Sequence, residues 1–126
     1  MLRFIAIIIF GVLLIMGCSR VSEEYRNGRA AARADVTKGI LAIAYAEGSQ
    51  LPPCWFYYEE LLRTNYGVKR YVVSLPANEE AAEAWARGYN EVGQPETERR
   101  FGTNVLKHTM AEAQIMYDQM NRQARQ

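Results

Sequence analysis

The sequence is poor in the side chains that build metal and nucleophilic sites. Its 126 residues include one histidine, His108, and two cysteines, Cys18 and Cys54. One histidine and scattered carboxylates do not give the ligand spacing of a zinc or calcium site. The glycines stand singly, so no glycine-rich loop for phosphate is present. We therefore expect no metal and no cofactor.

The chain also lacks a charge excess of either sign. Its 15 basic and 14 acidic residues leave a net charge of +1. A nucleic-acid-binding protein needs a clustered basic face, so this class is disfavoured. The length suits one small domain and is too short for a two-lobed enzyme, while 49% hydrophobic residues favour a folded body.

One hydrophobic run opens the chain. Arg3 precedes the segment 4–16, which has no polar side chain, and the composition turns polar from Arg20 onward. A run this short fits the core of a signal peptide better than a membrane-spanning helix, which needs about 20 apolar residues. Counted from 2 to 17 the run approaches spanning length, so a single-pass anchor is the alternative.

The junction Ile15-Met16-Gly17-Cys18 resembles the lipobox of bacterial lipoproteins, although Met16 is bulkier than the usual residue at its position. The resemblance implies cleavage before Cys18 and a diacylglycerol on the Cys18 sulfur. Each buried methylene contributes about 0.8 kcal/mol, and stable anchoring needs more than one acyl chain. We therefore predict a signal peptide (1–17), a lipidated N-terminus and tether (18–28) and a single small domain (29–122).

This resemblance also implies a location. A lipid-modified Cys18 would attach the chain to a membrane of the cell envelope. Ser19, rather than aspartate, follows Cys18, a pattern that resembles lipoproteins sent to the outer membrane in a Gram-negative host.

The pattern after Cys18 predicts a strand–helix–strand unit. An alanine-rich helix is expected over about 23–38, with Gly39 ending it, followed by a buried strand over 40–45. Aromatic and aliphatic residues spaced three and four apart predict a helix over 55–66, ended by Gly67. The segment 69–75 reads as a second strand, which completes a βαβ unit.

Helices are expected to fill the remainder. Asn78 is a candidate N-cap for a helix that we expect to be interrupted at Gly93-Gln94-Pro95, and a last helix is expected over about 103–122. The predicted fold class is therefore α/β, a compact helix-rich body around a short βαβ unit, after a cleaved N-terminal signal peptide. Two strands alone form a marginal sheet, which needs helical cover or a partner molecule.

Cys54 and His108 are the candidates for chemistry. Cys54 opens a predicted helix, where the helix dipole lowers a thiol pKa, so it is a candidate reactive thiol; the alternative is a small apolar residue in the core. The surrounding Pro53-Cys54-Trp55-Phe56 does not match a papain-like nucleophile motif. We expect His108 to be a solvated helix residue, and we predict no catalytic residue.

The candidate partner-binding residues are four consecutive aromatics and two arginines: Trp55, Phe56, Tyr57, Tyr58, Arg99 and Arg100. Four successive aromatics surround a helical turn, so they cannot all face one small core. Our main hypothesis is a non-enzymatic module that binds a protein partner or forms a homo-oligomer. A cell-wall glycan module using Trp55, Tyr57 or Tyr58 is the alternative, and a thiol-dependent envelope enzyme using Cys54 is a weaker one.

The mature segment resembles small bacterial proteins of unassigned function that have a similar order of elements. The resemblance rests on short stretches, which are 28–35, Tyr66-Gly67-Val68, Gly88-Tyr89-Asn90 and Arg99-Arg100-Phe101-Gly102. It implies no activity and no catalytic residue.

Overall fold

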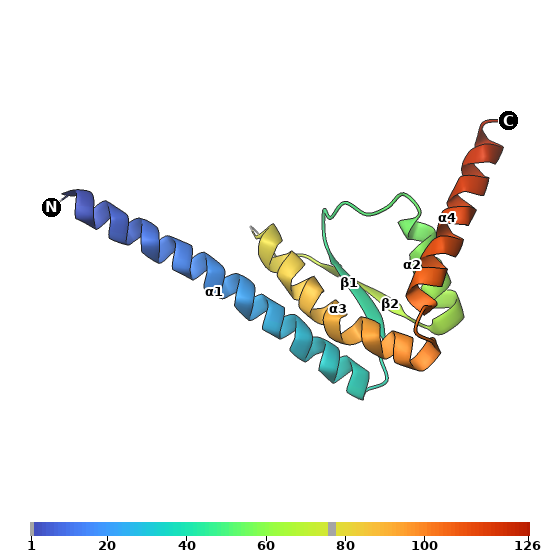
Figure 1. The fold of residues 1–126 in the computed structure, drawn as a ribbon, viewed down its shortest axis with the longest axis horizontal. Coiled ribbons are helices and arrows are strands. Elements are labelled where there is room, and N and C mark those ends of the chain that lie inside the picture. The colour runs from blue at the N-terminus through green and yellow to red at the C-terminus, as the bar shows by residue number, and fades with distance from the viewer. Residues whose placement is uncertain (1, 76–77) are drawn as a thin grey trace.

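The computed structural model describes the backbone of residues 2–75 and 78–126, and the side chains of residues 20–75 and 78–126. The side chains of the predicted signal peptide and of Cys18 therefore lie outside the described part. The elements follow the order α1 (Leu2–Thr37), β1 (Ala42–Ala46), α2 (Trp55–Tyr66), β2 (Lys69–Val73), α3 (Glu79–Phe101) and α4 (Val105–Ala124) (Figure 1).

The strand–helix–strand unit is present as predicted. β1 and β2 pair in parallel, with Ala42 opposite Lys69 and Ala46 opposite Val73. The predicted bounds of α2 are confirmed, and Gly67 ends this helix with a φ of 68°, in the left-handed region that glycine adopts without strain. The helix-rich α/β fold class is confirmed.

Helices cover the sheet in two pairs. α3 packs on one side of the sheet with α1 beside it, and α2 packs on the other side with α4 beside it (Figure 1). Leu41, which directly precedes β1, and Ile43 within it belong to the core shared with α2 and α4. The alternate residues Ala42 and Ala44 belong to the core shared with α1 and α3. The small alanine side chains let α3 approach the sheet closely.

The N-terminal helix is longer than the sequence predicted. α1 begins at Leu2 and runs beyond the rest of the body at its N-terminal end (Figure 1). Tyr25 bonds to Glu91 of α3, and Gly28 contacts the α3 backbone at Trp85. Contacts with the folded body thus extend N-terminal to residue 29, where the domain was expected to begin.

The predicted interruption at Gly93-Gln94-Pro95 is wrong, because α3 continues through it to Phe101. Proline removes one helical hydrogen bond and costs about 3 kcal/mol in a helix interior. Gly93 and Thr97 on either side are buried, whereas Pro95 is exposed. Packing on both sides therefore holds the helix together across the proline.

The remaining helix ends agree with local sequence signals. The Asn78 side chain accepts a hydrogen bond from the Ala81 N–H, as expected of an N-cap. α4 begins at Val105 and reaches Ala124, slightly beyond the expected end at residue 122. In the described part of the chain, no helix is both long enough and apolar enough to cross a membrane.

Candidate functional site

The four consecutive aromatics divide between core and surface. Tyr58 is buried, Trp55 and Tyr57 are half-buried, and Phe56 is 70% exposed. The Trp55 Nε1–H donates to Glu59 Oε1 at 2.7 Å, and the Trp55 ring meets Tyr45 edge-on, with centroids 5.6 Å apart. Trp55 and Tyr58 therefore stabilise the fold, and Phe56 is the aromatic presented to solvent.

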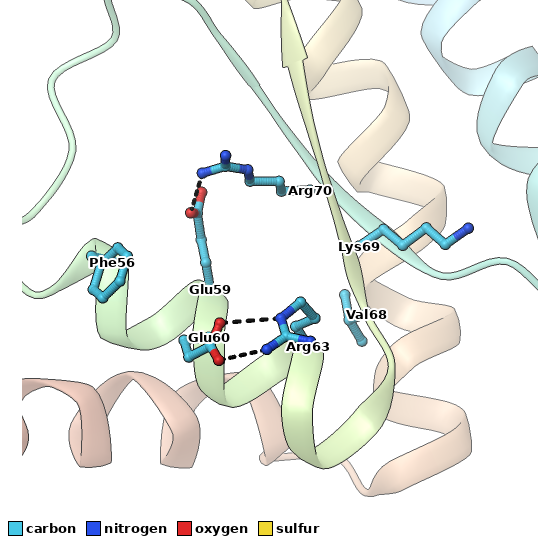
Figure 2. Close-up of a pocket in the computed structure, with 7 residues that line it drawn as sticks. All are labelled: Phe56, Glu59, Glu60, Arg63, Val68, Lys69 and Arg70. Carbon is cyan, nitrogen blue, oxygen red and sulfur yellow. Dashed lines mark hydrogen bonds and ion pairs between the residues drawn. The ribbon is translucent and has the colours of Figure 1, made fainter.

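Phe56 stands at the edge of an open groove between α2 and the beginning of β2 (Figure 2). The groove has a volume of about 470 Å³. Its lining comprises Phe56, Glu59, Glu60, Arg63, Val68, Lys69 and Arg70. Sequence reasoning identified only Phe56 of this set, because the groove exists only once the parallel strand returns beside α2.

Ion pairs order the charged wall of the groove. Arg70 Nη1 lies 3.0 Å from Glu59 Oε2, and Arg63 Nη2 lies 2.5 Å from Glu60 Oε1 (Figure 2). The Arg63 hydrogen bond lowers the pKa of the Glu60 carboxyl, which stays ionised at neutral pH. None of the lining residues is a thiol, a hydroxyl nucleophile or a histidine. Both carboxylates of the groove are held in ion pairs with arginines.

Cys54 does not lie in this groove. It is 1% exposed, and its Sγ lies 3.7 Å from Met110 Sδ of α4. The thiol belongs to the core between the sheet and the two helices α2 and α4. His108, on α4, is exposed.

The two candidate arginines lie elsewhere, in the last turn of α3. Arg99 Nη2 is 2.5 Å from Glu96 Oε1, and this hydrogen bond raises the pKa of Arg99. Arg99 and Arg100 are exposed and do not line the groove.

The run Gly88-Tyr89-Asn90-Glu91 connects α3 to other elements through each of its four residues. The sequence analysis did not predict this structural role. Gly88 contacts the α1 backbone at Tyr25. The Tyr89 hydroxyl donates to Asp35 Oδ2 at 2.7 Å, and burial followed by the Asp35 bond raises the Tyr89 pKa. The only sequence signal was the run itself, since its partners lie more than 40 residues away.

Asn90 bonds to both main-chain groups of Ala44 in β1. Its Oδ1 accepts from the Ala44 N–H at 2.9 Å, and its Nδ2 donates to the Ala44 carbonyl at 2.7 Å. The adjacent Glu91 pairs with Arg29 of α1 at 3.0 Å. Asn90 therefore occupies the outer edge of β1.

Among the side chains that the structure describes, no group of three or more from His, Cys, Asp or Glu comes close enough together to hold a metal ion. Comparisons with protein-family models, with curated proteins and with solved structures find no match for this chain.

Proposed function

We propose that this chain is a lipid-anchored protein of the bacterial cell envelope whose α/β body is a non-enzymatic protein-interaction module. The anchor rests on the lipobox-like junction at Cys18. The observation that carries the interaction role is the exposed ring of Phe56, at the mouth of a groove that borders β2.

An aromatic ring in this position is suited to binding another polypeptide. Large aromatic side chains bury much area, and they dominate the energetics of protein interfaces. Arg63 and Arg70 beside Phe56 are paired with carboxylates, so they provide a polar rim without an unpaired charge to bury.

The geometry supports this role over the two alternatives. Stacking on a sugar needs an accessible ring face. Tyr58 is buried, the Trp55 ring is in contact with Tyr45 and Tyr58, and Tyr57 is half-buried beside Phe56. A thiol-dependent reaction needs access to a thiolate, whereas Cys54 is enclosed beside Met110.

Mass spectrometry of the chain purified from native membranes tests the anchor. We expect a mature N-terminus at Cys18 carrying acyl chains, and a Cys18→Ala chain that is not processed. An unmodified residue 1, or a mature start at any other residue, would overturn the anchor and the envelope location.

Photo-crosslinking in cells tests the interaction surface. A photoreactive phenylalanine derivative at position 56 should give protein adducts, and the same group at Glu83, an exposed position on α3, is the matched control. Equal yields at the two positions would contradict the proposed role. Sedimentation with purified peptidoglycan that disappears in Tyr57→Ser would instead favour the glycan alternative.

A further inference from the structure

The two edges of the sheet differ in what they expose. The outer edge of β1 is covered, because Asn90 bonds to the N–H and C=O of Ala44. α3 is so close here that a Cβ on Gly93 would lie 3.2 Å from the Ala42 oxygen. No further strand can pair with β1.

The outer edge of β2 has no such cover. The Lys69 N–H donates to Leu41 O, and the Glu47 N–H donates to Val73 O, so residues 69, 71 and 73 face β1. Main-chain groups alternate along a strand, so Arg70 and Val72 direct their N–H and C=O groups outward. No hydrogen bond among the described residues uses these outward groups. The Val72 side chain is also 49% exposed.

An open edge with an exposed apolar residue is a template for pairing with another strand. We infer that two copies of this chain pair through β2, antiparallel about a twofold axis, with Val72 opposite Val72 of the second copy. This would join the two short sheets into one four-stranded sheet. The inference rests on the lipid anchor of the proposed function and concerns the edge of β2, a surface separate from the ring of Phe56.

Charge selects this arrangement and register. A parallel pairing in register would place Arg70 beside Arg70 of the second copy, and like charges directly opposite each other are destabilising. In the antiparallel pairing centred on Val72, Arg70 faces the neutral Ser74 of the second copy. The two Arg70 residues are then four positions apart along the strands, roughly 13 Å at 3.3 Å per residue.

A register centred on Tyr71 is less favourable. Arg70 would then face Val72 of the second copy, and the two arginines would be only two positions apart, roughly 7 Å. The centre on Val72 also buries the two exposed valine side chains against each other.

The membrane anchor makes so small an interface sufficient. Pairing along one five-residue strand buries little area compared with a typical stable dimer. Two copies held in one membrane meet at a high effective concentration, so a weak contact becomes populated. Dimer formation should therefore be measured in membranes with the full chain.

Cysteine crosslinking in membranes tests the pairing and its register. Directly opposite residues on antiparallel strands have Cα atoms about 4.5–5.5 Å apart, within disulfide range. With an added oxidant, Val72→Cys should give a crosslinked homodimer, whereas the parent chain and Glu83→Cys should not. Coexpressed Arg70→Cys and Ser74→Cys chains should crosslink to each other, and Arg70→Cys alone should crosslink far less.

Two variants at the centre of the interface provide an independent measurement. Val72→Lys places like charges opposite each other at an exposed position, so differently tagged copies should no longer copurify from membranes. Val72→Thr keeps the side-chain shape, and its copies should still copurify. Circular dichroism checks that both variants fold.

A Val72→Cys chain that crosslinks no better than Glu83→Cys would overturn the dimer. A Val72→Cys chain that crosslinks only to a different protein would also overturn it, while the proposed interaction module would stand. If Cys18 carries no lipid, the proposed function fails instead. Mass spectrometry of the N-terminus detects that outcome independently of the crosslinking.

Discussion

Gly28 of α1 and Gly88 of α3 bring the two helix backbones into contact. A Cβ on Gly28 would lie 2.0 Å from the Trp85 carbonyl oxygen, and a Cβ on Gly88 would lie 2.1 Å from the Tyr25 carbonyl oxygen. The absence of a side chain at both positions is what permits this crossing. The contact is central to the fold, because α3 packs on the sheet and α1 joins the body mainly through α3 (Figure 1).

Gly88→Ala should therefore destabilise the protein. Alanine favours a helix over glycine by about 1 kcal/mol, but here its methyl group would meet a backbone carbonyl that moves only if the helices separate. Overpacking of this kind costs about 1–3 kcal/mol, and we expect a net loss. Urea unfolding of the full chain in detergent measures it. Glu83→Ala, at an exposed position of α3, is the control, and an equal effect of the two substitutions would contradict the close crossing.

Asn90→Asp should weaken the contact between α3 and β1. Aspartate keeps an acceptor for the Ala44 N–H but loses the donor to the Ala44 carbonyl, and an unsatisfied buried polar group costs about 1–3 kcal/mol. Asn90→Ala removes both bonds, so it should also speed hydrogen exchange at the Ala44 amide. Asn65→Asp, at an exposed position of α2, is the control. Unchanged exchange at Ala44 in Asn90→Ala would refute the bridging role.

Tyr58 should make the protein less stable at alkaline pH. Burial, and to a smaller extent the charge of Glu98, raises the pKa of Tyr58 to about 12 from an ordinary value of 10. Between these values the unfolded chain loses the proton while the folded chain keeps it. The Tyr58 contribution to the free energy of unfolding is therefore constant below pH 10 and falls as the pH rises toward 12, by up to about 1.4 kcal/mol per pH unit.

Urea unfolding at a series of alkaline pH values measures this effect, and tyrosinate absorbance reports the ionisation. Tyr58→Phe should show a shallower decline than the parent chain. The same decline in both chains would mean that another group causes it.

Cys54 should be protected from alkylation in the folded protein. Its thiol is covered by Met110 and neighbouring core residues, so reaction requires local opening. Peptide mass spectrometry should show modification slower by more than about tenfold than at Asn65→Cys, an exposed control position. Denaturant should remove the difference. Native alkylation of Cys54 at the control rate would restore the reactive-thiol alternative.

The sequence alone predicted the elements whose ends depend on near neighbours. Aromatic and aliphatic spacing gave the bounds of α2, Gly67 gave its end, and Asn78 gave the start of α3. Such signals act within one helical turn or one strand. They are therefore readable without any knowledge of the tertiary structure, and they were enough to predict the parallel βαβ unit.

The tertiary structure decided what depends on residues far apart in the chain. α3 continues through Pro95 because buried contacts on both sides outweigh a local helix-breaking signal. Of the four consecutive aromatics at 55–58, Phe56 is the exposed one because Tyr45 and α4 cover its neighbours. Asn90 covers the outer edge of β1, while the outer edge of β2 stays open. The residues near Asn90 in the sequence give no indication that Ala44 is its hydrogen-bond partner. Local backbone preferences extend over a few residues, whereas packing and hydrogen bonding join residues more than 40 positions apart, and only the folded chain brings those residues together.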